Sequence, residues 1–205
     1  NLAEINDLNL ARCLFAYDEY FISLLRHERI LPVVESLIGF YMVLQLQNAI
    51  INHPSQKHIQ SSWHRDLPYQ FFTSSKPLAV NAYFCLCDYS EKTGSTAVLP
   101  FSHKIEQLPS VDYISNNEVS VTAPAGSVIF FDSMVFHRAG SNTSDIIRRG
   151  INQVYTAGII KQQINLPNFL DGKYSDDPFL EMLLGYSSEP AKSVVDWREK
   201  KSKKS

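Results

Sequence analysis

The sequence predicts a mainly β fold, a sandwich or barrel with helices at its flanks, from three observations. From residue 41 onward, short runs rich in Val, Ile, Phe and Tyr are separated by turn material such as EKTG, PAG and SNTSD. Two helix-like stretches precede these runs instead of alternating with them, which argues against βαβ units. The chain has 205 residues, enough for one domain with a sizeable core.

The first forty residues predict the helical flank. Apolar residues recur at steps of three and four over residues 8–31, as on one face of a helix. Pro32 then fits the first turn of a second helix, and Gly39 fits its end. Near the other end of the chain, the apolar cluster FLEMLLGY (179–186) predicts a helix that closes one side of the core.

Six to eight short strands are expected between these helical parts. They lie within residues 41–51, 78–89, 96–103, 118–123, 127–132, 134–137 and 148–160. Gln45 and Gln47 share one face of the first strand, as either its solvent face or a contact inside a barrel. The predicted organisation is one domain over residues 1–205. Its parts are a helical flank (1–40), a β core (41–160), a helical cap (161–196) and a solvated basic tail (197–205).

Composition argues against several classes of function. The net charge is −2, so no general attraction to nucleic acid or to an anionic membrane is expected. The longest apolar run, residues 37–44, is too short to span a bilayer. Three cysteines are an odd and sparse set, which favours a reducing, cytoplasmic compartment over a disulfide framework. The oligomeric state, and whether residues precede Asn1, cannot be read from the sequence.

The segment SSWHRDLPYQ carries a His-x-Asp pattern. Residues i and i+2 of a strand point to the same side, so His64 and Asp66 project together while Arg65 turns away. A third ligand can come from His137, 73 residues after His64 and on a different expected strand. Two imidazoles and one carboxylate on one face of a metal favour Fe(II) and oxygen chemistry. Taken alone, His-x-Asp is equally a polar pair on a surface strand.

A guanidinium opens the next expected strand. After His137 the chain passes through turn-forming residues and reaches Arg148 and Arg149, of which only one can face inward. A buried unpaired charge is costly, and a carboxylate bound in bidentate fashion is the natural partner of an arginine. A co-substrate with a keto acid at one end and a carboxylate at the other, such as 2-oxoglutarate, would satisfy both the iron and the arginine. Alternatively, both arginines are exposed on an edge strand.

Three stretches, HRDLPY, LCDYSEKTGSTAVLPFSHK and PAGSVIFFDSMVFHRAGSNTSDIIRR, together resemble the phytanoyl-CoA dioxygenase family of Fe(II)/2-oxoglutarate-dependent oxygenases. The resemblance spans about residues 41–157. It implies a double-stranded β-helix, that is, a jelly-roll, cupin-like fold with flanking α-helices. It also implies that His64, Asp66 and His137 are the catalytic metal ligands. Arg148 matches the co-substrate arginine by spacing, with Arg149 as the alternative.

The resemblance has departures and further implications. Phe101 stands where the family usually has Gly, Ser127 where Asp is usual, and Ala139 where a Ser or Thr often helps to hold the co-substrate. Asn81 and Tyr83 are placed toward the cavity, as co-substrate-binding residues. Gln45 is assigned to the same group from the barrel-interior reading of its strand.

The implied activity is hydroxylation of a small-molecule substrate with O2 and 2-oxoglutarate, releasing succinate and CO2. Asp66 stands where halogenating relatives carry a small residue, which favours hydroxylation or a related oxidation. One alternative is a cupin-like protein that binds a metal or small ligand without turnover, and another is a zinc hydrolase. The identity of the substrate cannot be read from the sequence.

Several neighbouring residues receive structural expectations. Trp63 points opposite to His64 and is expected to pack beneath it. His103 is expected to bond a turn. His53 and His58 are expected to be solvated or to lie near a substrate entrance.

Overall fold

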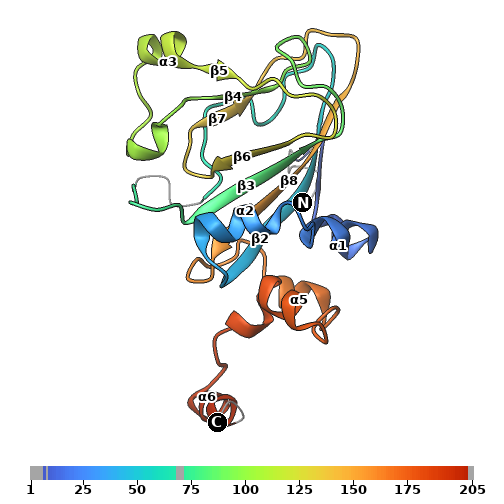
Figure 1. The fold of residues 1–205 in the computed structure, drawn as a ribbon, viewed down its shortest axis with the longest axis vertical. Helices are drawn as coiled ribbons and strands as arrows, with labels where there is room; N and C mark the ends of the chain where they lie inside the picture. The colour runs from blue at the N-terminus through green and yellow to red at the C-terminus, as the bar shows by residue number, and fades with distance from the viewer. Residues whose placement is uncertain (1–6, 8, 68–71, 203–205) are drawn as a thin grey trace.

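The computed structural model describes residues 7, 9–67 and 72–202. Two antiparallel sheets carry the fold, and most of the helices lie toward one end of them, whereas α3 (Val111–Asn117) lies at the other end beside the smaller sheet (Figure 1). The larger sheet has the order β1 (Leu10–Arg12), β2 (Met42–Asn52), β8 (Arg148–Ala157), β3 (Ala79–Cys85) and β6 (Val128–Asp132). The smaller sheet has the order β5 (Val119–Ser120), β4 (Thr96–Val98) and β7 (His137–Ala139). The mainly β architecture expected from the sequence is confirmed.

The core lies where helices cover one face of the larger sheet. Side chains from the central strands, such as Leu44 and Tyr155, form one buried cluster with Leu25 of α1 (Tyr20–Leu25) and Val34 of α2 (Leu31–Ile38). The same cluster includes residues of α4 (Leu166–Leu170) and α5 (Pro178–Leu183). Burial of each large aliphatic side chain contributes about 1.5–3 kcal/mol. This packing makes the central strands a firm support for the residues at their other end.

The helix expected over residues 8–31 is wrong in its first half. Leu10–Arg12 is a strand that extends the larger sheet, with Leu10 opposite Ile50 of β2. Cys13 then adopts a left-handed conformation (φ 53°), and a single 3-10 turn, η2 (Leu14–Ala16), follows. Apolar spacing of three and four arises here because the chain turns its side chains into the core after the strand, not because it coils continuously.

The two glutamines of β2 are buried, so the solvent-face reading is wrong. Gln47 accepts a hydrogen bond from the backbone of Phe15 and donates one to the carbonyl of Phe21. Gln45 donates to one backbone carbonyl and accepts from one backbone amide within residues 161–163. A bulge interrupts the β2–β8 register at Gln45. Both side chains therefore attach flanking segments to the sheet.

Other predicted elements agree with the structure more closely. The second helix has Pro32 in its first turn and ends at Gly39, whose φ of 88° favours glycine. The expected C-terminal helix is α5, capped by Asp177, which accepts hydrogen bonds from two backbone amides. Between β4 and β5 lie a 3-10 turn, η3 (Ser102–Lys104), and the short helix α3 (Val111–Asn117).

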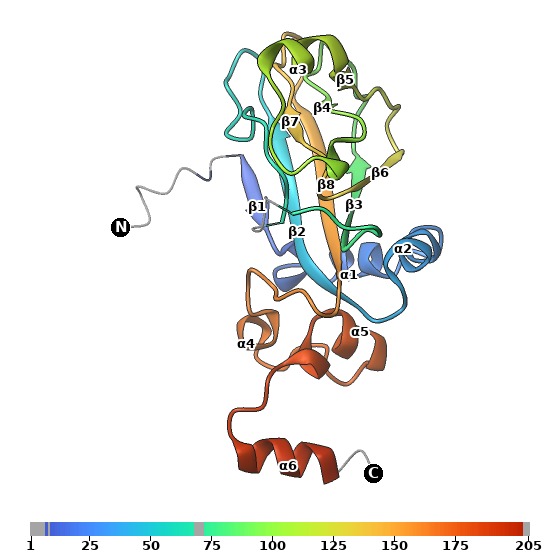
Figure 2. The same cartoon turned by 90° about the vertical axis from the view of Figure 1, so that its left-hand side faces the viewer.

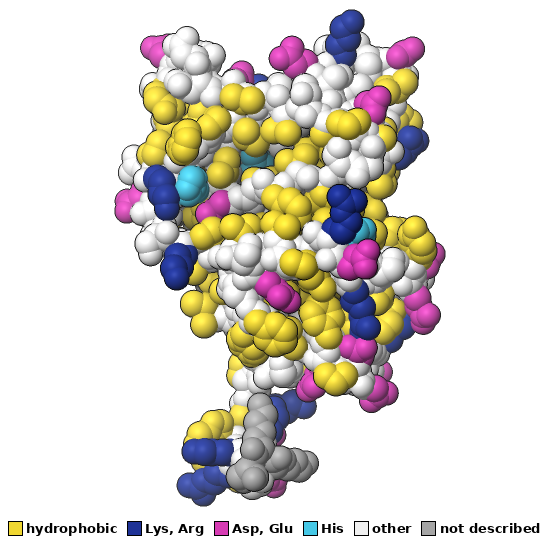
Figure 3. Space-filling model, viewed as in Figure 1, with side chains coloured by type: hydrophobic (Ala, Val, Ile, Leu, Met, Phe, Trp, Pro, Cys, Tyr) yellow, Lys and Arg dark blue, Asp and Glu magenta, His cyan; other side chains and the backbone are white. Residues whose placement is uncertain are grey.

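The basic tail differs from expectation. Its described part belongs to helix α6 (Val194–Ser202), which stands away from the rest of the chain (Figure 2). An ion pair between Asp196 and Lys200, with 3.4 Å between nitrogen and oxygen, links successive turns of this helix. Basic side chains gather on it in the space-filling view (Figure 3). In the part of the chain that the structure describes, no helix combines the length and apolar character needed to cross a bilayer.

Candidate metal centre and co-substrate cavity

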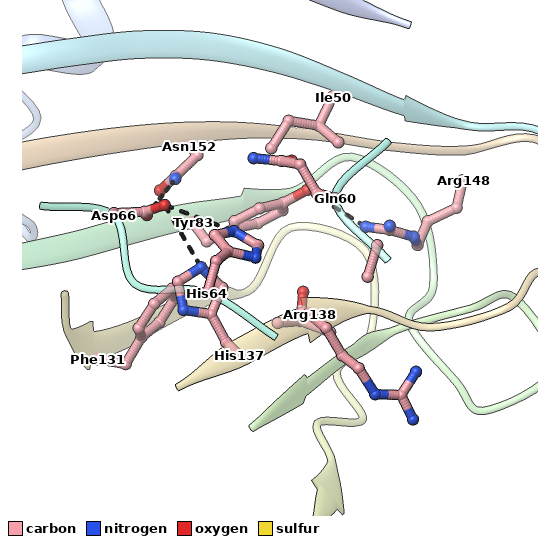
Figure 4. A pocket seen from close by; sticks show the side chains of 12 residues that line it. Ile50, Gln60, His64, Asp66, Tyr83, Phe131, His137, Arg138, Arg148 and Asn152 are labelled. Atoms are coloured by element: carbon pink, nitrogen blue, oxygen red, sulfur yellow. Dashed lines mark hydrogen bonds and ion pairs between the residues drawn. The ribbon is translucent and has the colours of Figure 1, made fainter. Parts of the chain in front are cut away.

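Three of the predicted side chains meet at one point. His64, Asp66 and His137 each offer a ligand atom, and these atoms lie within 4.8 Å of one another. The Nε2 atoms of His137 and His64 lie 3.5 Å and 3.8 Å from Oδ1 of Asp66 (Figure 4). We call this group the metal end. It confirms that residues 73 positions apart come together in the fold.

Backbone pairing brings the two histidines together. His64 and His137 form an isolated antiparallel bridge in which each backbone amide donates to the other's carbonyl at 3.0 Å. The amide of Asp66 donates in the same way to the carbonyl of Ser133 at 3.1 Å. The segment of the His-x-Asp motif therefore runs beside the chain that enters β7, and both imidazoles emerge on the same side.

Hydrogen bonds to the backbone orient both imidazoles. Nδ1 of His64 donates to the carbonyl of Ser62 at 2.8 Å, and Nδ1 of His137 donates to that of Val135 at 2.9 Å. Each ring thus carries its proton on Nδ1 and turns Nε2, with its lone pair, toward Asp66. Nε2 of His64 is buried and has no hydrogen-bond partner among the described residues. The two imidazoles and the carboxylate form a donor set that fits a divalent transition metal, and the unpartnered Nε2 of His64 is one of its donor atoms.

Amide side chains hold the carboxylate of Asp66 from behind. Asn81 donates to Oδ2 at 2.5 Å, and Asn152 donates to the same oxygen at 3.3 Å. Asn81 also bonds Asn152, and its own carbonyl oxygen accepts from the hydroxyl of Ser133. One oxygen of Asp66 is therefore fixed by neutral donors, and the other faces the imidazoles.

The charges of the metal end shift one another's pKa. Burial alone would raise the pKa of Asp66, but the charge and hydrogen bond of His137, and then the charge of His64, hold it well below its ordinary value. Burial opposes the protonation of His137, yet the Asp66 carboxylate raises the pKa of that imidazole. Burial, followed by the charge of His137, lowers the pKa of His64. Of the two imidazoles, His137 is therefore the one that binds a proton more readily.

A buried arginine lies at the opposite end of the same cavity. Arg148, at the start of β8, is 1% exposed and donates from Nη1 to the hydroxyls of Tyr83 (3.2 Å) and Tyr89 (2.9 Å). Its Nε has no hydrogen-bond partner within the described ranges. Arg149 is exposed, as alternation along the strand predicts. We call Arg148 with its two tyrosines the arginine end.

The two phenol rings fit only because of a glycine. A Cβ built on Gly150 would lie 2.3 Å from a ring carbon of Tyr83 and 2.3 Å from the hydroxyl of Tyr89, too close for any side chain. Burial raises the pKa of Tyr89 far above its ordinary value, so this phenol stays neutral beside the guanidinium. Three residues thus share one face of β8. Arg148 supplies a charge, Gly150 leaves space for the two phenol rings, and Asn152 supplies an amide.

One cavity joins the two ends (Figure 4). Its lining comprises Ile50, Gln60, His64, Asp66, Tyr83, Thr96, Phe131, His137, Arg138, Ala139, Arg148 and Asn152. Ala139 has no hydroxyl to offer, but its partner across the β4–β7 ladder is Thr96. A hydroxyl is therefore available in this lining at the position that pairs with 139.

The other predicted residues fall into different places. Tyr83 lines the cavity, whereas Asn81 lies behind Asp66 and holds it. Gln45 is absent from the cavity lining, and its amide bonds backbone groups within residues 161–163. Trp63 packs against a buried cluster that includes Phe136.

His58 and His103 depart from expectation. His58 is only 4% exposed, so the solvated reading is wrong, and its Nδ1 accepts from the amide of Gln60. Burial, and then the charges of Arg148 and His64, lower the pKa of His58 to about 4. His103 was expected to bond a turn, but its buried Nδ1 has no partner among the described residues.

Several residues around the site have no assigned role in the sequence analysis, among them Thr96, Tyr89, Ser133 and Asn152. Asn152 could have been found, because it shares a strand face with Arg148. Tyr89, Ser133 and the contacts of Arg65 carry no local pattern, since their partners lie far away in the chain.

The comparisons with known proteins agree with this geometry. A sequence profile of the family described as Phytanoyl-CoA dioxygenase (PhyH) matches residues 3–150. An uncharacterized protein of Mycobacterium tuberculosis is 30% identical over 99% of this chain and 76% of its own length, and one of Mycobacterium bovis gives the same values. The dioxygenase hkm4 of Aspergillus hancockii is 30% identical over 45% of this chain and 32% of its own length.

Solved structures share the fold. The non-heme alpha ketoglutarate dependent epimerase SnoN from nogalamycin biosynthesis matches with a TM-score of 0.59 at 24% identity, covering 73% of this chain and 61% of that one. The alpha ketoglutarate dependent carbocyclase SnoK also has a TM-score of 0.59, at 20% identity, with coverages of 73% and 64%. A second SnoN structure contains Fe3+, alpha ketoglutarate and nogalamycin RO. The chain spans about three fifths of these enzymes, and the likeness confirms the double-stranded β-helix.

Proposed function

This chain belongs to the phytanoyl-CoA dioxygenase family of Fe(II)/2-oxoglutarate-dependent oxygenases, and we propose that it hydroxylates a small-molecule substrate with release of succinate and CO2. The observation that carries the proposal is the single cavity with a His-Asp-His group at one end and a buried guanidinium at the other. Each end matches one part of the co-substrate: the metal would bind its keto acid, and the arginine its far carboxylate.

His64, Asp66 and His137 are the proposed iron ligands. Their Nε2 atoms and Oδ1 face one another, and two imidazoles with one carboxylate leave further positions of a metal open for exogenous ligands. Bound iron supplies the oxygen activation that no amino-acid side chain provides. The chain's own contribution is to fix these three groups. Asn81 and Asn152 hold the carboxylate, and backbone carbonyls set both imidazole tautomers.

Arg148 is the proposed partner of the far carboxylate of 2-oxoglutarate. Tyr83 and Tyr89 occupy Nη1 and fix the plane of the guanidinium, and Nε is left without a protein partner. Thr96 supplies the hydroxyl that Ala139 lacks, because the two residues pair across the small sheet and both line the cavity. A charge-assisted contact of this kind selects a dianionic co-substrate over a neutral one.

The remaining features of the proposal concern context. The three cysteines are free, which supports a reducing, cytoplasmic setting. The assignment of residues 1–205 to one oxygenase domain remains a prediction. Ile50 and Phe131 give the cavity apolar walls that reduce the access of water to the reacting groups.

Anaerobic titration with Fe(II) and 2-oxoglutarate tests the proposal. The wild-type protein is expected to develop the visible charge-transfer band of the chelated co-substrate, and succinate is expected to form when O2 and a substrate are supplied. A screen across acyl thioesters, amino acids, small polar metabolites and natural products should yield a product one oxygen atom heavier. Stoichiometric uptake of 2-oxoglutarate with no succinate across all these classes would instead favour the binding protein without turnover.

A further inference from the structure

The residue between two of the proposed iron ligands points away from them and is completely enclosed. Arg65 is 2% exposed, although its neighbours His64 and Asp66 face the cavity. We propose that Arg65 is a positioning residue that aligns the His-x-Asp segment with His137, so that the three ligands converge. This inference rests on the proposed function, because it concerns the same metal end.

The guanidinium of Arg65 bonds backbone carbonyls on two separate segments. Its Nε donates to the carbonyl of Met134 at 2.6 Å, in the segment that leads into β7. Its Nη1 donates to the carbonyl of Glu106 at 3.0 Å, and its Nη2 donates to those of Ser102 (2.7 Å) and Ile105. One side chain therefore joins the His-x-Asp segment to the approach to His137 and to the turn at 102–106.

Ser102 closes the same arrangement from the other side. Its hydroxyl accepts a hydrogen bond from the amide of Phe136 at 2.7 Å, one residue before His137. Its carbonyl accepts from Arg65. The turn is thus attached to both segments that carry metal ligands. This attachment gives a structural reason for the serine in the stretch PFSH (100–103). The turn contacts the two segments on the side remote from the cavity.

The geometry explains why this position needs an arginine. Its planar fork serves carbonyls in several directions, whereas the three donors of a lysine radiate from one nitrogen. The guanidinium carbon also lies 3.9 Å from the centre of the Phe136 ring, a cation–π contact that holds the plane. The two carbonyls that accept from Nη2 belong to Ser102, the first residue of η3, and to Ile105, which follows η3 directly.

The pairing that Arg65 supports is short and sensitive to slippage. His64 and Asp66 make backbone bonds to the 133–137 segment, and one further bond, from the amide of Ala139 to the carbonyl of Gln60 at 2.8 Å, continues the pairing. A slip of one residue would turn both ligands away from the cavity. An anchor on the opposite face, between the two ligands, resists that slip directly.

Metal binding and stability separate positioning from a general contribution to folding. Co(II) serves as the probe, because its affinity and its visible ligand-field bands both report the ligand geometry. Arg65→Met is expected to weaken Co(II) binding about 10–100-fold and to change the bands, the range seen when a group that orients a metal ligand is removed. Arg65→Lys should fall between Arg65→Met and wild type, as partial rescue.

Matched variants complete the test. Leu183→Ala removes a buried side chain from the main core on α5, so it should lower the Tm while leaving the Co(II) affinity and bands as in wild type. Phe136→Leu removes the ring against Arg65 and keeps an apolar side chain in the buried cluster, so it should weaken Co(II) binding by about 3–10-fold, in the range of a lost cation–π contact. It decides the question if both Arg65 variants fail to fold.

The Co(II) measurements distinguish a failure of the positioning role of Arg65 from a failure of the proposed metal centre. Wild-type Co(II) affinity and bands in folded Arg65→Met, or in Phe136→Leu if it alone folds, would overturn the positioning role and leave the proposed function intact. If wild-type protein itself binds Co(II) no better than Asp66→Ala, the proposed metal centre fails, and this inference fails with it.

Discussion

The metal end and the arginine end hold their charged groups by the same principle but with different parts of the fold. At the metal end, two amides fix Oδ2 of Asp66 and leave Oδ1 facing the imidazoles. At the arginine end, two phenols fix Nη1 of Arg148 and leave Nε without a protein partner. Each end thus fixes one part of a charged group with neutral protein side chains and leaves another atom of that group without a protein hydrogen bond, so little reorganisation is needed when a ligand binds.

The two ends differ in how they are supported. Arg148 begins the ten-residue strand β8, at the centre of the larger sheet, and inherits its position from a long ladder. His64 and Asp66 lie outside the named strands, and an isolated bridge pairs them with the chain around His137. The metal end therefore depends on a few specific side-chain contacts, and the arginine end on regular secondary structure. Substitutions that act on one end only can test this distinction.

The largest effect is expected from Asp66→Ala. Loss of the carboxylate removes one of three metal ligands and the negative charge that faces both imidazoles. Succinate release should be abolished and Co(II) binding weakened by at least 100-fold. Isothermal titration and a coupled succinate assay give the two readings. Asp196→Ala, on the distant helix α6, is the control and should behave as wild type. Undiminished turnover in Asp66→Ala would reject the assignment of this ligand.

Arg148→Ala should also abolish succinate release, but by a different route. The co-substrate loses its proposed carboxylate partner, so 2-oxoglutarate binding should collapse while Co(II) binds within about threefold of wild type, since the metal end keeps its own contacts. Arg149→Ala is a matched control one residue away, with an exposed side chain, and should leave both unchanged. The reverse result, with loss in Arg149→Ala alone, would transfer the role to the second arginine.

This contrast also explains what could be read from the sequence. Strand alternation placed His64 with Asp66, and it required that only one of Arg148 and Arg149 face inward; both inferences need only local geometry. The convergence of His137 was a hypothesis, because spacing alone does not say which distant segments pair. The resemblance to a family made it specific.

Errors arose where tertiary contacts overrode a local pattern. The helical spacing around Leu10 belongs to an edge strand that pairs with β2, and that pairing cannot be seen in residues 8–31. Gln45 was assigned to the co-substrate from its strand face. Its amide instead bonds the backbone of residues 161–163, more than a hundred positions later. Buried polar residues attract functional readings, although their partners are often backbone groups of another segment.

A smaller effect is expected from Tyr89→Phe, which alters the arginine end without removing its charge. The variant loses the 2.9 Å hydrogen bond to Arg148 but keeps the ring under the guanidinium. A lost hydrogen bond of about 1 kcal/mol predicts a rise of about 3–10-fold in the KM for 2-oxoglutarate, with unchanged Co(II) affinity. Tyr155→Phe, another buried phenol, whose hydroxyl bonds Gln153, is the control. A changed Co(II) affinity in Tyr89→Phe would show that the two ends are not independent.

Acidification should act on the metal end before the arginine end. Metal binding needs neutral imidazoles, and the Asp66 carboxylate raises the pKa of His137 in the metal-free protein. As the pH falls through that raised pKa, protons compete with the metal, and the apparent Co(II) affinity should fall by up to about tenfold per pH unit. The affinity of metal-loaded protein for 2-oxoglutarate should vary by less than about twofold over the same range. Co(II) titrations from pH 8 down to pH 6 measure the slope, and a flat profile would contradict the coupling of His137 to Asp66.

The smallest effect is expected from a substitution of His58, whose pKa is influenced by the charge of Arg148 at the arginine end and that of His64 at the metal end. Burial, together with the charges of Arg148 and His64, lowers the pKa of this imidazole to about 4, below the ordinary 6.5. Between these two values the unfolded chain binds the proton and the folded protein does not, so stability is full above pH 6.5 and declines as the pH falls toward 4.

His58→Asn keeps an acceptor for the amide of Gln60 but cannot titrate. Urea unfolding at pH 7.5 and at pH 5 should show that the variant loses about 1–2 kcal/mol less stability on acidification than wild type. His53→Asn, at a half-buried position in the same loop, should lose as much as wild type. An identical loss in His58→Asn and wild type would mean that folding does not lower the pKa of this imidazole, and would contradict the prediction.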